Sequence, residues 1–404
     1  MKNKGISGQC CGCYSCVTIC PVDAIKMQPD EYGFFHASLN KVTCINCGKC
    51  EKVCPLISGT VHNRMIDAFA GYCVDDEMRK LSTSGAIFPA IARRVLEDDG
   101  VVYGVEGIFE GSHYVARHIR LSAVDELYRI QGSKYIQSSC PDMYPQIQKD
   151  VKMGKTVLAS GTPCQIAALN NYLDCCYDNL ITVDVVCHGI SSQALFNDYV
   201  DNHMRSEHEK IIEYEFRTKK RDWGTNYSMK VDNGFGVERW IVSPGITSSF
   251  YQLYLNSVLV RDSCFSCPFA SLDSRPADIT LGDYWGVESS GLCISEQEVN
   301  KGVCCVLANT KKGFEILKGA SALQLYKANV DHIASNNGQL NAPCVAPKER
   351  ESYLDRYKSA GYGGVEDLYQ SQNLRTLRIV KAKERIPYCI RKKIKVVAGH
   401  IMGK

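Results

Sequence analysis

A cysteine spacing that occurs twice in the first 55 residues constrains this chain more than any other feature. The segment CCGCYSCVTICP, residues 10–21, spaces its cysteines as Cys-x2-Cys-x2-Cys-x3-Cys-Pro, and CINCGKCEKVCP, residues 44–55, repeats that spacing. Cys11 lies outside the register. The start, MKNKGISGQC, has no apolar signal-peptide core, so we expect a cytoplasmic protein. In that reducing compartment, 22 cysteines indicate metal ligands rather than disulfides.

The repeated spacing is typical of bacterial ferredoxins with two 4Fe-4S clusters. Three closely spaced thiolates hold three corners of one cube, and the fourth cysteine of each run ligates the other cluster. The predicted ligands are Cys10, Cys13, Cys16 and Cys54 for the first cluster, and Cys44, Cys47, Cys50 and Cys20 for the second. Paired zinc sites or a disulfide framework are the alternatives, but zinc motifs usually present two ligand pairs separated by a longer spacer.

Between the two runs, AIKMQPDEYGFFHASL, residues 24–39, predicts short strands around a glycine turn. We therefore assign residues 1–58 to an α+β ferredoxin-like domain with two clusters. We assign residues 59–345 to an α/β catalytic domain and residues 346–404 to a C-terminal extension.

The segment from residue 155 onward predicts a βαβ unit. TVLAS indicates a buried strand, GTPC a tight turn, QIAALNNYL a helix, and LITVDVVCHG a second strand. Open α/β sheets bind ligands at such glycine turns, and the helix start beyond the turn favours an anion. A glycine at this place is also common for steric reasons alone.

Four further cysteines sharpen the prediction. Cys164 closes the GTPC turn, Cys187 follows the next strand, and Cys264 and Cys267 form a CxxC pair. Four thiolates are what a third 4Fe-4S cluster requires. Two alternatives remain: Cys164 and Cys187 are small buried core residues, or Cys164 is a nucleophile with His188 as its base.

Six motifs occur along the chain in the order STSGA (82–86), QGSKYIQS (131–138), GTPCQIAAL (161–169), VVCHGI (185–190), SCFSCPFA (263–270) and ADITLGDYWG (277–286). In this the chain resembles the family of coenzyme F-420 hydrogenase/dehydrogenase beta subunits, in which a ferredoxin module is a common companion. The resemblance implies an α/β flavin-binding domain with FAD as cofactor. It places FAD against Ser84, Gly85, Gly132, Ser133, Lys134, Tyr135, Gly161 and Thr162.

Two details of this resemblance are open. Lys134 is expected to pair with a phosphate of FAD, or else to be a solvated surface lysine. Ala86 stands where the family pattern leads us to expect a second glycine.

The resemblance supports two functions. In the first, electrons pass from the N-terminal clusters through the third cluster to FAD, which delivers hydride to an organic acceptor, coenzyme F-420 or another small metabolite. In the second, the chain is a non-catalytic relay subunit of a larger hydrogenase or dehydrogenase. The electron donor is expected to be a soluble ferredoxin or a partner subunit. No catalytic side chain is assigned.

Two basic segments and one aromatic residue complete the sequence. RTKKRDWG, residues 217–224, is expected to be the edge of a basic hairpin, with contact to an acidic substrate or a deazaflavin tail as the alternative. Trp285 is expected to pack in the core, with stacking on a cofactor as the alternative. Residues 374–404 hold ten of the 47 Lys and Arg but one of the 44 acidic residues. We favour a solvated tail, with peripheral contact to an anionic membrane surface as the alternative, and expect no nucleic-acid partner.

Overall fold

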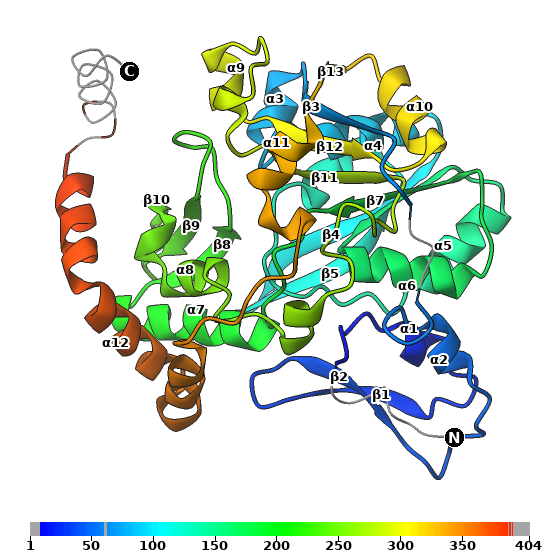
Figure 1. Ribbon diagram of the computed structural model, residues 1–404. Coiled ribbons are helices and arrows are strands. Elements are labelled where there is room, and N and C mark those ends of the chain that lie inside the picture. The colour runs from blue at the N-terminus through cyan, green and yellow to red at the C-terminus, as the bar shows by residue number, and fades with distance from the viewer. Residues whose placement is uncertain (1–8, 60–62, 387, 389, 391–404) are drawn as a thin grey trace.

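The computed structural model describes residues 9–59, 63–386, 388 and 390. Within them the chain forms three packed parts: a small N-terminal module, a large mixed sheet with helices on both faces, and a small sheet packed on a long C-terminal helix that is kinked at Gly361 (Figure 1). The architecture is therefore a mixed α/β fold that begins with a ferredoxin-like module. In this described part of the chain, no helix is long and apolar enough to cross a membrane.

The N-terminal module consists of two short helices and one hairpin. Its elements are α1 (Ser15–Thr18), β1 (Ile25–Pro29), β2 (Phe35–Leu39) and α2 (Lys49–Val53). The two strands pair antiparallel, with Ile25 opposite Leu39. Gly33, at a φ of 75°, lies in the turn between them. The predicted pair of strands around a glycine turn is confirmed.

The two cysteine runs share a backbone conformation as well as a spacing. In the first run Gly12 and Tyr14 have φ angles of 66° and 68°, and in the second Asn46 and Gly48 have φ angles of 54° and 71°. Each pair occupies the second and fourth positions after the first cysteine of its run. A short helix then starts directly after Tyr14 and after Gly48. The repeat in the sequence is thus a repeat of one loop structure.

The large sheet has eight strands in the order β13-β3-β12-β11-β7-β6-β4-β5. The central neighbours β11, β7, β6 and β4 are parallel, and the pairs outside them are antiparallel. Its strands are β3 (Asp67–Cys73), β4 (Val101–Glu110), β5 (His113–Leu121), β6 (Val157–Gly161), β7 (Leu180–Val185), β11 (Ile279–Asp283), β12 (Cys304–Ala308) and β13 (Leu323–Lys327). The predicted βαβ unit is confirmed as β6, the helix α6 (Pro163–Leu173) and β7.

Helices cover both faces of this sheet because its central strands are apolar on both sides. On one face Val102 and Leu158 pack against α4 (Ile87–Glu97). On the other, Val101 and Val157 pack against α6 and α5 (Met143–Lys152). The remaining elements around the sheet are α3 (Asp76–Lys80), α9 (Glu296–Asn300), α10 (Lys311–Gly319), α11 (Val330–Ser335) and the 3-10 turns η1 (Val124–Ile130), η3 (Asp262–Ser266), η4 (Val287–Ser289) and η5 (Gly338–Leu340).

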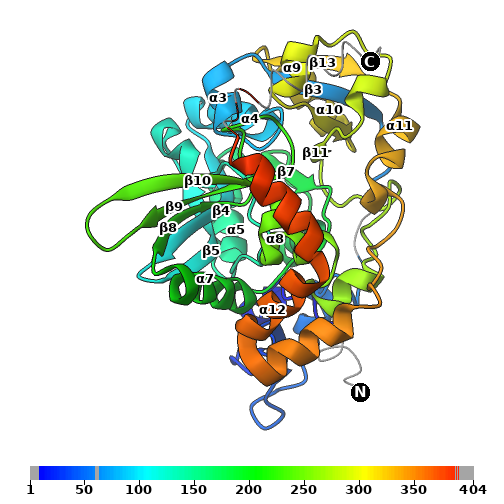
Figure 2. The same cartoon turned by 90° about the vertical axis from the view of Figure 1, so that its left-hand side faces the viewer.

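The small sheet has the antiparallel order β10-β9-β8. Its strands are β8 (Lys210–Glu215), β9 (Asn226–Asp232) and β10 (Glu238–Pro244), and around it lie α7 (Gln193–Glu207), η2 (Gly245–Thr247), α8 (Ser249–Leu255) and α12 (Arg350–Glu384). An aromatic core joins these elements: Phe196 of α7, Phe250 of α8 and Tyr362 of α12 are all buried in it. Figure 2 shows α12 crossing over α8. The C-terminal extension therefore packs into this core through α12, which includes the first part of the basic segment 374–404 and buries its Leu377. Residues 387, 389 and 391–404 lie outside the described residues.

Candidate functional site

The cysteines predicted to hold the first cluster gather around one small cavity. Cys10, Cys13, Cys16 and Cys54, here called the inner set, line a space of about 30 Å³ in the N-terminal module, and Cys50 borders it as well. Burial raises the pKa of Cys54 to about 11, with further contributions from the thiols of Cys13 and Cys10. The fourth cysteine of the second run thus lies near the first three of the first run, and the assignment of ligands to each cluster stays a prediction.

The cysteines predicted for the second cluster include the exposed cysteine of the module, and the other three are half-buried. Cys20, Cys44, Cys47 and Cys50 form this outer set, and Cys47 is exposed. Backbone N–H groups approach two of its sulfurs: that of Ala24 donates to Cys20 Sγ over 3.2 Å, and that of Asn46 to Cys44 Sγ over 3.4 Å. Such donors stabilise thiolates that bind iron.

No three His, Cys, Asp or Glu side chains converge on the position of a single metal ion within the described ranges. The thiolates of a four-iron cube bind separate iron atoms at its corners, so they stand farther apart than the ligands of one ion.

Three side chains of the main body hold the first cysteine loop by its backbone. Gln137 Nε2 donates to the carbonyls of Cys11 (3.0 Å) and Gly12 (2.6 Å), and Arg261 Nη1 donates to the carbonyl of Cys10 (2.9 Å). Tyr144 donates its hydroxyl to the carbonyl of Cys13. Gly12 suits this contact, because its φ of 66° lies in the left-handed region and a Cβ at its position would lie 2.3 Å from Gln137 Nε2. The inner side of the module is therefore docked on the body.

The four body cysteines also lie together. Burial raises the pKa of Cys187, and the neighbouring thiols of Cys264, Cys164 and Cys267 raise it further. Burial raises the pKa of Cys267 to about 11, again with a contribution from Cys164. We call these four cysteines the body set. Cys344 is a neighbour that sequence reasoning missed: its Sγ lies 3.7 Å from the carbonyl oxygen of Cys264, and no motif surrounds it in the sequence.

The two alternatives for Cys164 and Cys187 fit this geometry less well. Both residues are half-buried and border a large cavity, and Cys164 packs at the edge of a core cluster rather than inside it. His188 directs its ring nitrogens elsewhere, with Nε2 3.2 Å from Ser257 Oγ and Nδ1 3.0 Å from Gln339 Nε2. The Cys164 thiol instead lies 3.2 Å from Thr162 Oγ1.

Cys11 connects the two regions. It is 8% exposed, and its thiol interacts with that of Cys13 in the inner set and that of Cys164 in the body set. Through these interactions Cys11 lowers the pKa of Cys13 to about 7 and lowers that of Cys164. It also lines both the small cavity and the large one. The cysteine that stands outside the sequence register thus lies where the module meets the body.

The large cavity measures about 440 Å³, within the range of small-molecule sites. It opens at the carboxyl ends of the parallel strands, where Gly161, Val185 and Asp283 line it. Seven of the eight residues expected to contact FAD line this cavity: Ser84, Gly132, Ser133, Lys134, Tyr135, Gly161 and Thr162.

Gly85 is the exception. The resemblance led us to expect that its small size admits a ring system, but Gly85 is not among the residues that line the cavity. A Cβ on Gly85 would lie 2.4 Å from the carbonyl oxygen of Gly71 and 2.9 Å from the amide nitrogen of Cys304. Its glycine is required by packing between β3 and β12.

The Ser82–Gly85 loop is held from two sides. The backbone N–H and the hydroxyl of Ser133 lie 2.9 and 3.0 Å from Thr83 Oγ1, which joins this loop to the second expected flavin loop. From the small sheet, Lys219 Nζ donates to the carbonyls of Ser84, Arg79 and Lys301. Burial lowers the pKa of Lys219 to about 7, yet three carbonyl acceptors use all three protons of the ammonium form.

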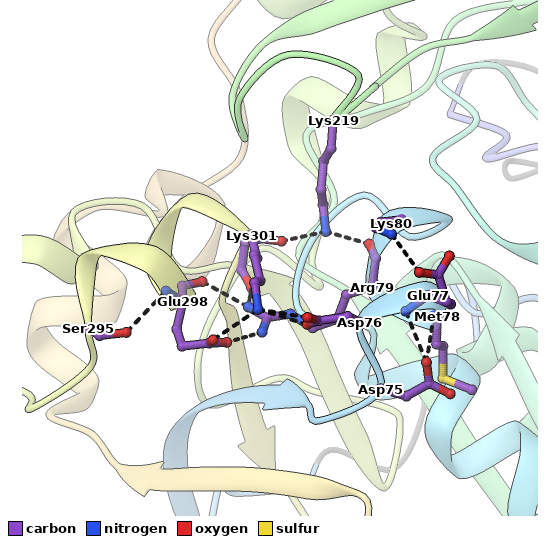
Figure 3. Close-up of polar contacts among 11 residues, drawn as sticks. Asp75, Asp76, Glu77, Met78, Arg79, Lys80, Lys219, Ser295, Glu298 and Lys301 are labelled. Atoms are coloured by element: carbon purple, nitrogen blue, oxygen red, sulfur yellow. Dashed lines mark hydrogen bonds and ion pairs between the residues drawn. The ribbon is translucent and has the colours of Figure 1, made fainter.

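Figure 3 shows the polar network under this lysine. Arg79, which is 2% exposed, forms an ion pair with Glu298 and donates Nη2 to the carbonyls of Glu298 (2.8 Å) and Gly302 (2.9 Å). Lys301 Nζ lies 2.9 Å from both carboxylate oxygens of Asp76. These contacts fix α3 and α9 beneath the Ser82–Gly85 loop.

Two expectations about basic and aromatic residues are wrong. The segment 217–224 is not a solvated hairpin edge, because Arg217 lines the large cavity and Lys219 is directed inward. Trp285 is not a core residue: it is half-buried, lines the same cavity and stacks on Trp223 at 5.1 Å between ring centroids.

Lys134 is not a freely solvated lysine either. Burial lowers its pKa to about 7, and its Nζ donates to the carbonyl of Gln131 over 2.7 Å.

Comparison with known proteins agrees with this geometry. Residues 154–331 match the family model that describes the C terminus of the beta subunit in coenzyme F420 hydrogenase/dehydrogenase, and residues 9–56 match that of the 4Fe-4S dicluster domain. The fold and the cysteine sites thus define an iron-sulfur protein of the oxidoreductase type. Its segment 154–331 belongs to the family of coenzyme F-420 hydrogenase/dehydrogenase beta subunits, and its N-terminal module to the 4Fe-4S dicluster domains.

Individual relatives are distant or short. The F(420)H(2) dehydrogenase of Methanosarcina mazei has a subunit, named F, that is 18% identical over 223 residues, which are 53% of this chain and 63% of that protein. The putative oxidoreductase UacF of Escherichia coli is 33% identical over 93 residues, 22% of this chain and 13% of that protein. A 7Fe ferredoxin of Hydrogenibacillus schlegelii is 40% identical over 52 residues, 13% of this chain and 59% of the ferredoxin. The chain covers less than two thirds of each of these relatives.

Among solved structures, a chain of the F420-reducing [NiFe] hydrogenase complex from Methanosarcina barkeri, in its xenon derivative, is similar over 73% of this chain and 94% of that chain. The two are 15% identical, with a TM-score of 0.44, so we draw no argument from this likeness.

Proposed function

We propose that this chain is an iron-sulfur flavoprotein oxidoreductase. It takes electrons at its ferredoxin-type clusters, passes them through a third cluster to FAD, and delivers hydride to coenzyme F-420 or another small organic acceptor. One observation carries the proposal: the large cavity is lined both by the expected FAD loops and by Cys164 and Cys187 of the body set, and Cys11 of the ferredoxin module reaches it too.

The residues present suit the proposed cofactors. Each cluster would be held by four cysteines, the number and type of ligand that 4Fe-4S clusters use. FAD, when bound, would supply the junction between one-electron and two-electron chemistry. Lys134 would face its phosphates, and the start of α6, where Thr162 caps the helix and Cys164 follows, would present N–H groups to a negative charge.

The side chains around the cavity have roles that need no further group. Gln137, Tyr144 and Arg261 fix the first cysteine loop against the body, which keeps the inner set at a constant distance from the body set. Lys219 fixes the Ser82–Gly85 loop, which forms one wall of the cavity. Preorganised walls of this kind keep a bound cofactor in one orientation.

A relay subunit is the second candidate. It is favoured by the similarity to a protein named as a subunit of F(420)H(2) dehydrogenase. In that case the acceptor would react on a partner chain, and this chain would have no acceptor site of its own.

Reduction kinetics of the isolated chain test the proposal. With FAD bound, we expect a dithionite-reduced viologen dye or reduced ferredoxin to bleach the flavin rapidly, whereas NADH and NADPH do so slowly or not at all. Turnover of a small acceptor by the lone chain would favour the enzyme over the relay. Rapid, stoichiometric flavin reduction by NADH that survives loss of the module clusters would overturn the proposed entry of electrons.

A further inference from the structure

Arg217 lines the large cavity and has one guanidinium edge without a hydrogen-bond partner among the described residues. It follows β8, is 8% exposed, and lines the cavity wall. Its Nη1 donates to Asp283 Oδ2 over 2.8 Å and lies 3.4 Å from the hydroxyl of Tyr135. Its Nε and Nη2 are buried and have no hydrogen-bond partner among the residues that the structure describes. A buried donor without a partner is costly, so a ligand is the natural acceptor for these two groups.

The geometry of the guanidinium group defines the class of that ligand. Nε–H and Nη2–H lie on one edge of the planar group and point in parallel, which is the arrangement that binds two oxygens of a carboxylate or phosphate. The opposite side is already engaged by Asp283. The unused edge is thus a two-pronged donor for an oxyanion.

The surroundings add aromatic surfaces and one further hydroxyl. The guanidinium carbon of Arg217 lies 5.1 Å from the ring centre of Trp285, which in turn stacks on Trp223. Tyr251 also lines the cavity and is fully buried. Its hydroxyl is a neighbour of Tyr135 but makes no hydrogen bond of normal geometry within the described part of the chain. Flat apolar walls with a few convergent donors are typical of small-molecule sites.

The carboxylate that pairs with Arg217 does not exclude an anion from the site. Asp283 is occupied at both oxygens, by Arg217 and by Trp223 Nε1 at 3.2 Å. Lys219 interacts electrostatically with both Arg217 and Asp283. The charge of Asp283 is thus compensated by its two donors, and Lys219 acts on it from nearby, although Lys219 is not among the residues that line the cavity.

We propose that the Nε and Nη2 edge of Arg217 is a binding site for a two-oxygen anionic group, a carboxylate or a phosphate, inside the large cavity. The group belongs either to the organic acceptor or to the flavin nucleotide. The proposal deepens the proposed function and rests on it for the two candidate ligands, the organic acceptor and the flavin nucleotide. The site itself is defined by the side chains alone.

The test compares the full-length protein with two variants. Arg217→Gln removes the positive charge, and Arg217→Lys keeps the charge but lacks the pair of parallel N–H donors. Arg239→Gln is the matched control, because Arg239 lies on β10 of the same sheet and pairs with Glu209 at the surface. Calorimetry measures the binding of benzoate, an aromatic carboxylate, and of benzamide, its neutral counterpart. Separate titrations measure the affinities for FAD, FMN and riboflavin.

Two results would support the site, and they distinguish the organic acceptor from the flavin nucleotide as the molecule that carries the anionic group. If the acceptor carries the anion, both Arg217 variants weaken benzoate binding at least about tenfold and leave FAD affinity unchanged. If the flavin phosphate is bound there, they weaken FAD and FMN at least about tenfold, spare riboflavin, and benzoate competes with FAD. Arg239→Gln changes none of these values.

Two results overturn the site: Arg217 variants that bind benzoate and FAD as the wild type does, or a wild type that binds benzamide as tightly as benzoate. Arg217-dependent benzoate binding by a chain that takes up no flavin would keep the site and refute the proposed function. If the variants do not fold, protection of Arg217 from chemical modification in the wild-type protein tests the site instead. Benzoate, and not benzamide, must slow modification of Arg217 by phenylglyoxal, followed by mass spectrometry, and equal rates would refute the site.

Discussion

The thiol of Cys11, in the first loop of the ferredoxin module, lies near enough to the thiol of Cys164 at the start of α6 to lower its pKa. Because Cys11 also neighbours Cys13, a line of three sulfurs joins the inner set to the body set. The outer set has an exposed member, Cys47. Under the proposed function, electrons therefore enter at the outer set and reach the body through the inner set.

Replacing Cys11 by alanine should leave the iron content unchanged, because its position lies outside the ligand spacing and its thiol serves as a neighbour of two ligands. Iron analysis after anaerobic reconstitution measures this, with Cys13→Ala as the control that loses one cluster. A loss of about four irons from the Cys11 variant would show that it is a ligand after all.

Replacing Cys54 by serine should damage the cluster on Cys10, Cys13 and Cys16, because Cys54 lines their cavity rather than completing its own run. The cluster held by Cys20, Cys44, Cys47 and Cys50 should persist. Electron paramagnetic resonance of the reduced protein distinguishes the two, with Cys47→Ser as the complementary variant. Loss of only the second-run cluster in Cys54→Ser would refute the crossover.

Local patterns made much of the redox framework predictable. The cysteine runs and the turn at Gly161 are set by spacing and by short-range backbone preferences, which a sequence displays directly. The inward course of Arg217 and Lys219 was not predictable in this way. Their partners are distant in sequence: Asp283 is 66 residues from Arg217, and Ser84 is 135 residues from Lys219. A basic segment that faces a cavity also has the same local sequence pattern as one that faces solvent.

The family pattern predicts a glycine at position 86, where this chain has alanine, and the backbone at Ala86 explains that prediction. Ala86 caps the start of α4 at φ 62° and ψ 32°, a left-handed conformation that glycine adopts without strain. Gly85 shows the reverse case, since the need for glycine was expected there for ligand contact but arises from backbone packing.

Replacing Ala86 by glycine should therefore cost little, because relief of about 1–2 kcal/mol of backbone strain offsets the lost methyl group and the added chain entropy. Ala92→Gly, in the middle of α4 and fully buried, has no strain to relieve. Its free energy of unfolding should fall by about 1–2 kcal/mol more than that of Ala86→Gly. Denaturant unfolding of both variants measures the difference, and equal losses would argue against strain at Ala86.

His118 should make stability depend on pH below neutrality. Its Nε2 lies 3.0 Å from the carbonyl oxygen of Ser160, so the neutral ring donates there and accepts from Ser138 Oγ at 3.1 Å. Burial lowers the pKa of His118 from 6.5 to about 4, although the Ser160 carbonyl acts in the opposite direction. Between these values the unfolded chain binds a proton that the folded chain does not. Stability is thus complete above pH 6.5 and falls by up to about 3 kcal/mol as the pH drops toward 4.

The comparison of thermal midpoints at pH 7.5 and pH 5 checks this prediction. The thermal midpoint of the wild type should fall further from pH 7.5 to pH 5 than that of His118→Gln. The midpoint of the exposed control, His113→Gln, should fall as far as that of the wild type. Parallel losses in all three proteins would mean that His118 titrates normally.

The content of iron, acid-labile sulfide and flavin in the full-length protein, purified and reconstituted without oxygen, tests the central claim most directly. Twelve cysteines in three sets of four predict about twelve iron and twelve sulfide atoms per chain, from three 4Fe-4S clusters, together with one FAD. A protein that holds about eight iron atoms and no flavin would keep the two clusters of the module, but it would contradict a third cluster beside a flavin cavity.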